Sequence, residues 1–181
     1  MSVAYQYIAS GTYKTVLALS ADMNSKVVNW EDRKTCVFLG DGASGFVLQK
    51  SQRADIRKIK LYTNPKRYFG AYILAGGIEE PITTGNITTG RQYFTMNGRN
   101  IWKYSTTVFP STVNDLINEA DITLEQVDFV IPHQANLNII NEGLRQLEVP
   151  LDKTVINVDR YANTGGSSVG IALAEGIEKR L

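Results

Sequence analysis

Strands and helices alternate in the last third of the chain, and this alternation constrains the fold more than any other feature. An apolar run at residues 127–131 predicts a strand, and residues 136–147 follow with apolar side chains on one helical stripe. Residues 155–158 predict another strand before a helix at residues 167–181. Alternation of this kind predicts an α/β layered fold.

The same periodicity predicts which side chains of the two helices face inward. In the first helix the apolar stripe consists of Leu137, Ile140, Leu144 and Leu147. In the second helix the inward side chains are Val169, Leu173 and Ile177.

The start of the chain is less regular. Residues 3–10 read as the last turns of a helix, because Gly11 after them readily takes the left-handed conformation that ends helices. Residues 15–19 form an apolar run and predict a buried strand. Residues 57–62 alternate charged and apolar side chains, which predicts a half-exposed strand.

The middle of the chain is the hardest part to interpret. Residues 64–95 are rich in Gly, Thr and Pro, and we expect a long loop with one or two short strands. Residues 97–120 predict a helix that Pro110 should split or kink, because proline has no backbone N–H. The chain starts in the last turns of a predicted helix and stops at a helix end, so we expect the natural protein to extend in both directions.

Charge and cysteine content narrow the cellular setting. The net charge is +1, so no basic excess favours nucleic-acid binding. Cys36 is the single cysteine, which excludes an intrachain disulfide and fits a reducing compartment. The amino terminus lacks the features of a signal peptide, and no apolar run is long enough to span a bilayer. We therefore expect a cytoplasmic protein that binds neither nucleic acid nor membrane.

Two polar residues stand where the chain leaves predicted strands. His133, the single histidine, follows residues 127–131, and reacting groups in α/β folds collect at the carboxyl ends of strands. A lone histidine is more often structural, and this position shifts the balance toward function. Asn163 lies between a strand and a helix, where a turn asparagine flanked by glycines is the simpler interpretation.

Two short motifs are excluded by their surroundings. Residues 40–45 match G-x-G-x-x-G, but a strand-like run follows where a nucleotide-binding fingerprint needs a helix. Residues 166–170 match G-x-S-x-G, but the only histidine precedes the serine, whereas in hydrolases of this type it follows. Cys36 lies in an apolar run and reads as a core residue, and one His with one Cys makes no metal site.

Three segments together resemble one family. Residues 132–136 (PHQAN) are similar to the histidine motif of β-ketoacyl-acyl-carrier-protein synthase III, and residues 159–164 (DRYANT) are similar to its asparagine motif. Residues 38–43 (FLGDGA) resemble its glycine-rich segment. The ordered set is more specific than any one segment, and the similarity runs along nearly the whole chain, although residues 52–95 match loosely.

The resemblance implies a thiolase-like layered αβαβα fold, present only in part. Residues 1–51 would finish the amino-terminal half, and residues 52–181 would supply most of the carboxy-terminal half. The nucleophilic cysteine of the family would lie upstream of Met1, and the closing strands would lie beyond Leu181. We therefore expect this chain alone to be inactive.

The implied activity is that of an acyltransferase that starts fatty-acid synthesis by decarboxylative Claisen condensation. An acyl-CoA would load the cysteine, and malonyl-carrier protein would then lose carbon dioxide and attack the acyl thioester. His133 and Asn163 would donate hydrogen bonds to the enolate oxygen without adding net charge. No cofactor is implied, because acyl-CoA is a substrate.

Other residues acquire roles from the resemblance alone. Arg33 would contact the nucleotide end of coenzyme A, and the alternative is a surface salt bridge. The remaining substrate-binding candidates are Met96, Gly98, Trp102 and Asn136, for which ordinary packing is the alternative. The family often has an arginine two positions after the motif asparagine, where this chain has Asn138, so Lys103 and Arg145 remain as carrier-protein contacts.

The resemblance leaves alternatives open. A relative that serves secondary metabolism would differ in its choice of acyl donor, which this sequence does not specify. A non-catalytic partner subunit would keep the fold and lack the nucleophile. Family members are typically homodimers, so we expect a homodimer that uses acyl-CoA and acyl carrier protein.

Overall fold

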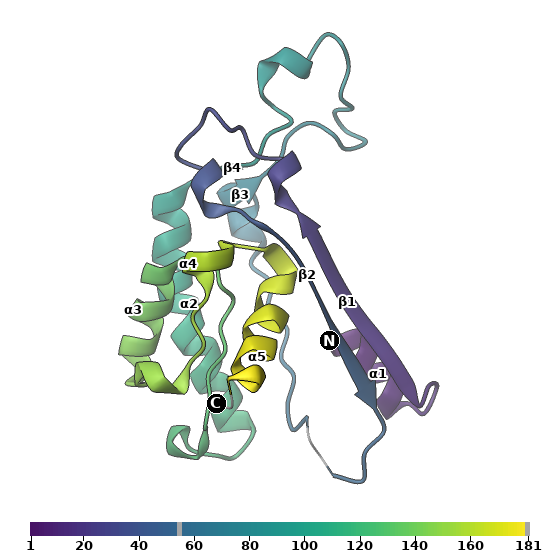
Figure 1. Cartoon of the computed structure of the whole chain (residues 1–181), viewed down its shortest axis with the longest axis vertical. Helices are drawn as coiled ribbons and strands as arrows, with labels where there is room; N and C mark the ends of the chain where they lie inside the picture. Colours follow the sequence, from purple (N-terminus) through teal and green to yellow (C-terminus); the bar gives the residue numbers. More distant parts are fainter. Residues whose placement is uncertain (54–55, 180–181) are drawn as a thin grey trace.

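The computed structural model describes residues 1–53 and 56–179, which fold into a long β-hairpin beside a group of helices (Figure 1). The helices α2 (Gly98–Glu119) and α3 (Leu137–Leu147) lie side by side, and α5 (Ser168–Glu178) lies between them and the hairpin. Within the described residues, no helix is both long and apolar enough to cross a bilayer. The mixture of strands and helices agrees with the predicted α/β class.

The hairpin consists of β1 (Thr15–Met23) and β2 (Asp41–Gln49), which are antiparallel. Its even-numbered side chains face α5 and the short helix η7 (Gly165–Ser167), while its odd-numbered side chains face outward. Leu17 and Leu19 are 57% and 74% exposed, so the predicted strand at residues 15–19 exists but is not buried. Among the described elements, none covers the odd-numbered side chains of β1 and β2.

The amino-terminal helix and its end are confirmed. Helix α1 spans Ser2–Ala9 and contacts both strands of the hairpin. Gly11 follows with φ +76°, the left-handed conformation expected of a residue after a helix end.

The hydrophobic core lies between α2, α3 and the segment after α3. Ile140, Leu144 and Leu147 are buried as predicted, together with Val149, while Leu137 is 42% exposed at the first turn. The partly buried residues around this core are Phe109, Val113, Leu124, Val130, Ile156 and Val158. The predicted helix at residues 136–147 is confirmed, with its start one residue later.

Two predicted strands do not form ladders. Among the described residues, a single parallel bridge lies next to these two segments, between Val130 and Thr154, and residues 155–157 lead into α4 (Val158–Tyr161). Side chains form hydrogen bonds with backbone groups that a neighbouring strand would otherwise bond. The hydroxyl of Thr154 donates to the carbonyl of Val130, and Gln134 pairs with backbone groups near residue 156.

The predicted strand at residues 57–62 is wrong. This segment is irregular and runs along the carboxy-terminal half of α2, where Lys58 and Lys60 form ion pairs with Glu119. The Tyr62 hydroxyl donates to Asp115, 3.2 Å away. The alternation of charged and apolar residues therefore reflects contacts with a helix and not with a sheet.

The long loop at residues 64–95 is confirmed, and part of it projects from the body (Figure 1). It contains η3 (Pro65–Gly70), η4 (Ile87–Thr89) and the short pair β3 (Ala71–Tyr72) and β4 (Thr95–Met96). The other short helices are η1 (Asn24–Lys26), η2 (Cys36–Phe38), η5 (Leu124–Gln126) and η6 (Leu151–Lys153).

Two helix predictions need correction. Helix α2 continues through Pro110, because the proline removes one backbone hydrogen bond while the buried face on either side packs against α3. In α5 the buried positions include Ser168 and Ala172, whereas Ile177 is 69% exposed and does not face inward. Small side chains dominate the inner face because β2 approaches α5 closely.

Candidate active site

His133 occupies the loop between the Val130 bridge and α3, with its side chain partly buried against α5 and partly open to solvent. Its Nδ1 atom lies 2.6 Å from Oγ of Ser168, the first residue of α5. Burial by the surrounding protein lowers the pKa of His133 below its usual 6.5, and the carboxylate of Asp22 offsets part of this effect. The imidazole is therefore neutral at neutral pH and still open to a reactant.

Gln134 anchors the backbone beside His133. Its side chain is 0% exposed and donates to the carbonyls of Pro132 and Val155, while its oxygen accepts from the Asn157 N–H. These bonds are between 3.0 and 3.1 Å long. They join the loop that carries His133 to the segment that leads into α4.

Asn163 is held by the chain that precedes β2. Its backbone N–H donates to Phe38 and its carbonyl accepts from Gly40, which gives the parallel bridge Leu39↔Asn163. A β-carbon on Gly40 would lie 2.2 Å from the carbonyl oxygen of Tyr161. Only glycine allows this approach, so Gly40 is required to position the Asn163 loop.

The side-chain amide of Asn163 is held at its oxygen end. Its Oδ1 accepts from the backbone N–H of Gly165, 3.0 Å away, which identifies the oxygen end of the amide. Across the described part of the chain, no acceptor pairs with its Nδ2. The amide therefore keeps N–H groups available for a reactant.

Asp22 of β1 contacts the start of the final helical segment. Its carboxylate accepts from the backbone N–H of Ser167 at 3.2 Å and from the Ser20 hydroxyl at 3.0 Å. A carboxylate at this position interacts favourably with the helix dipole. The hairpin, His133 and Asn163 therefore converge on the residues around the start of α5.

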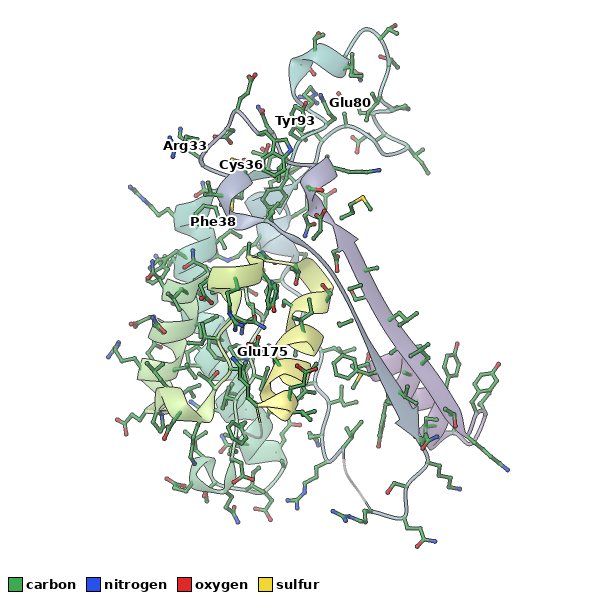
Figure 2. The ribbon with its side chains drawn as sticks, viewed as in Figure 1. Arg33, Cys36, Phe38, Glu80, Tyr93 and Glu175 are labelled. Atoms are coloured by element: carbon green, nitrogen blue, oxygen red, sulfur yellow. The ribbon has the colours of Figure 1, made fainter. Side chains whose placement is uncertain are left out.

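An ion cluster joins α4 to α5. Glu175, labelled in Figure 2, pairs with Arg160 at 2.5 Å and Lys179 at 2.6 Å and accepts from the Asn157 side chain at 3.0 Å. The guanidinium of Arg160, followed by the ammonium of Lys179, lowers the pKa of Glu175 to about 2. The cluster limits how far the 158–163 segment can move relative to α5.

The family comparisons agree with this geometry. The family model described as 3-oxoacyl-[acyl-carrier-protein (ACP)] synthase III matches residues 1–65, and the model of its C-terminal domain matches residues 117–181. This chain belongs to the synthase III family. The matched ranges contain His133 with its hydrogen-bond partner Ser168 and Asn163 with its bridge partner Leu39, and they leave out most of the projecting loop.

Two curated relatives and one solved structure at more than 30% identity are named as synthases III. The chain is 38% identical over 183 residues to β-ketoacyl-[acyl-carrier-protein] synthase III of Clostridium kluyveri, covering 100% of this chain and 55% of the relative. It is 39% identical to that of Roseiflexus castenholzii, covering 99% and 55%. The crystal structure of the Aquifex aeolicus synthase III is 32% identical with a TM-score of 0.86, covering 99% and 54%.

These comparisons confirm the thiolase-like fold that the resemblance implied. The chain spans about half the length of the curated relatives it matches. The division into residues 1–51 and 52–181 stays a prediction.

The predicted coenzyme A contacts are spread over the loops and α2. Arg33 lies exposed on the turn before η2, close to Cys36 and Phe38 (Figure 2), and no described carboxylate pairs with it. Met96 ends β4, Gly98 begins α2, and Trp102 is 41% exposed on the first turns of α2. Their roles in this synthase III chain stay predictions.

The structure also places Asn136 and the two basic residues, Arg145 and Lys103. Asn136 caps α3, where its Oδ1 accepts from the N–H of Asn138 at 2.9 Å. Arg145 forms a two-bond pair with Glu142, whereas Lys103 is exposed on α2. Contact of either basic residue with a carrier protein stays a prediction.

The sequence analysis missed the groups that hold the two candidate donors. Ser168 was considered only as a hydrolase nucleophile, yet it is 1% exposed and hydrogen-bonded to His133. Gln134, Asp22 and Gly40 were not singled out for positioning. One sequence signal pointed to these groups: Gln134 lies within the histidine motif, and Ser168 lies shortly after the asparagine motif. Cys36 is partly exposed on η2, so its prediction as a core residue is wrong.

Proposed function

We propose that this chain supplies the two hydrogen-bond donors of an acyltransferase that condenses an acyl-CoA with malonyl-carrier protein. The observation that carries the proposal is the pair of neutral N–H donors, His133 and Asn163, at the start of α5 in a synthase III chain. The names of the relatives support acyl carrier protein as the partner and fatty-acid synthesis as the pathway.

The donors would act when malonyl thioester loses carbon dioxide. The bond between the α-carbon and the carboxylate breaks, and its electron pair delocalises onto the thioester oxygen as an enolate. His133 and Asn163 would each donate a hydrogen bond to that oxygen. The α-carbon would then attack the acyl thioester, forming a carbon–carbon bond and expelling the thiolate that carried the acyl group.

Neutral donors suit this step because the thioester oxygen is uncharged in the bound malonyl thioester and acquires negative charge only as carbon dioxide leaves. The pKa of His133 is lowered mainly by burial, so the ring donates an N–H without carrying a positive charge. Fixed donors of this kind contribute about 3 kcal/mol each. Loss of either one should therefore slow the reaction by about a hundredfold or more.

The thiol that carries the acyl group is proposed to come from outside residues 1–181. Cys36 is the only thiol here, and within the described chain no hydrogen bond or ion pair joins it to His133 or Asn163. Cys36 also lies in a three-residue helix rather than at the start of a long helix. Residues 1–181 alone should therefore show no condensation.

The remaining roles complete the proposal. Arg33 would bind phosphate of coenzyme A, while Met96, Gly98, Trp102 and Asn136 would line the path to the donors. Lys103 would contact the acidic carrier protein, with Arg145 a minor contributor. We also propose a cytoplasmic homodimer, which light scattering and cell fractionation would test.

The decisive experiment compares the product of the complete gene with three derivatives. Condensation and malonyl decarboxylation would be measured with acetyl-CoA and malonyl-carrier protein for the gene product, its His133→Ala and Asn163→Ala variants, and residues 1–181 alone. The gene product should condense the substrates, each variant should lose about a hundredfold in rate, and residues 1–181 should be inactive. Thr107→Ala, an exposed change on α2, is the matched control.

The outcomes separate the parts of the proposal. Variants that retain full activity would remove His133 and Asn163 from the mechanism. A gene product with neither activity would instead support the non-catalytic partner. A panel of longer acyl-CoA donors would distinguish fatty-acid initiation from a secondary pathway by the preferred chain.

A further inference from the structure

The Ser168 hydroxyl sits between two nitrogen atoms. It lies 2.6 Å from Nδ1 of His133, and the backbone N–H of Gln134 donates to it at 3.3 Å. Ser168 is 1% exposed, so water has little access to its hydroxyl. Its hydrogen-bond partners therefore come from the protein.

The protons available on Ser168 and its two partners determine which atom donates in the hydrogen bond between Ser168 and His133. A serine hydroxyl has one proton and two acceptor lone pairs. Gln134 can only donate, because its backbone nitrogen carries the proton. If Nδ1 also donated, the buried hydroxyl would accept twice and its own proton would have no acceptor, which costs free energy. The backbone carbonyl of Thr164, one turn earlier, already accepts from Ser167.

We propose that Ser168 is a positioning residue that donates to Nδ1 of His133 and so holds the imidazole in the tautomer with its proton on Nε2. The exposed Nε2–H is then the donor available to a reactant. This inference rests on the proposed function for its catalytic meaning, but the tautomer itself is a property of the folded chain.

Gln134 connects Ser168 to the backbone of the loop that carries His133. Its N–H orients the Ser168 oxygen, and its buried side chain fixes the loop on which His133 lies. The imidazole ring is therefore held by Ser168 at the start of α5 and, through Gln134, by the 154–157 segment. A tautomer fixed in this way does not depend on a charged partner, which fits a donor that must remain neutral.

Nitrogen NMR tests the tautomer directly, because the chain contains a single histidine. The untagged chain would be labelled with ¹⁵N-histidine and recorded well above the histidine pKa. We expect the ring to show one unprotonated nitrogen, Nδ1, and one protonated nitrogen, Nε2, with no averaging. A protonated Nδ1 would overturn the proposal regardless of any enzymatic result.

Two substitutions at neighbouring buried serines give a matched comparison. Ser168→Ala should move both nitrogen shifts toward the averaged values of free imidazole. Ser167→Ala removes a hydroxyl that bonds the Thr164 carbonyl and does not touch His133, so it should leave them unchanged. Equal spectra for the two variants would refute the role of Ser168, and the spectrum of the unsubstituted chain decides the tautomer even if a variant does not fold.

Activity provides a separate readout. In the complete gene product, Ser168→Ala should lower kcat for malonyl decarboxylation about five- to tenfold with KM nearly unchanged, in line with loss of one hydrogen bond to the ring. Ser168→Thr, which keeps the hydroxyl, should restore much of this loss. A gene product without activity would refute the proposed function while the NMR result still decides the tautomer. An unchanged kcat in an active Ser168→Ala protein would refute the positioning role.

Discussion

Replacing Gln134 with leucine should destabilise the protein far more than the same change at Gln146. Gln134 is fully buried and joins three backbone groups. Gln146 is exposed on α3, where its side chain donates to Glu142. The two substitutions remove the same amide, so the difference between them measures what the buried hydrogen bonds contribute.

The magnitude follows from the groups left unpaired. Leucine at position 134 leaves the Val155 carbonyl and the Asn157 N–H without partners in the interior, and the Pro132 carbonyl in a partly buried site. Each buried unpaired group costs about 1–3 kcal/mol. Burial of the added apolar surface offsets about 1 kcal/mol. The net loss should be about 3 kcal/mol, a large share of a total stability of about 5–15 kcal/mol.

Urea unfolding followed by far-ultraviolet circular dichroism measures this loss. With a slope of about 2 kcal/mol per molar urea, Gln134→Leu should lower the midpoint by about 1.5 M. Gln146→Leu should stay within about 0.5 kcal/mol of the unchanged protein. Midpoints for the two variants that agree within error would refute the claim that Gln134 fixes the His133 loop.

Three further predictions concern packing and charge. Gly143→Ala should cost about 2 kcal/mol in urea unfolding, because its β-carbon would lie 2.0 Å from the ring of Phe109, whereas Gly98→Ala in open space on α2 should cost nothing. The low pKa of Glu175 predicts stability that is complete above pH ~5 and is lost as pH falls toward 2, so Glu175→Gln should flatten acid unfolding in that range. The proton NMR signal of His133 should titrate below pH 6.5, and a midpoint above that value would contradict its burial.

Local patterns correctly predicted the main helices and identified His133 and Asn163 as candidate donors, a role that stays a prediction. The stripe of Ile140, Leu144 and Leu147 identified α3 because side chains one turn apart share a face of the same helix. Gly11 marked the end of α1 through its own backbone preference. His133 and Asn163 were found because both follow short apolar runs and belong to segments that resemble one family.

Pairing between distant segments was predicted poorly. Residues 127–131 and 155–158 have the composition of strands, yet side chains of Thr154 and Gln134 bond some of their backbone groups, and in the described chain a single bridge, Val130↔Thr154, forms beside them. Residues 57–62 alternate as a strand would but lie against α2. An alternating pattern shows that a segment has two faces and does not show what covers either of them.

By itself, the sequence determined the α/β class, the main helices, the family and the identity of the two candidate donors, because these depend on periodicity and on short ordered motifs. Only the tertiary structure decided how the donors are held. Ser168 meets His133 from 35 residues away, and Gly40, directly before β2, meets the Asn163 loop. Hydrogen bonds and steric limits of this kind arise from contacts between segments far apart in the chain, and no local pattern encodes them.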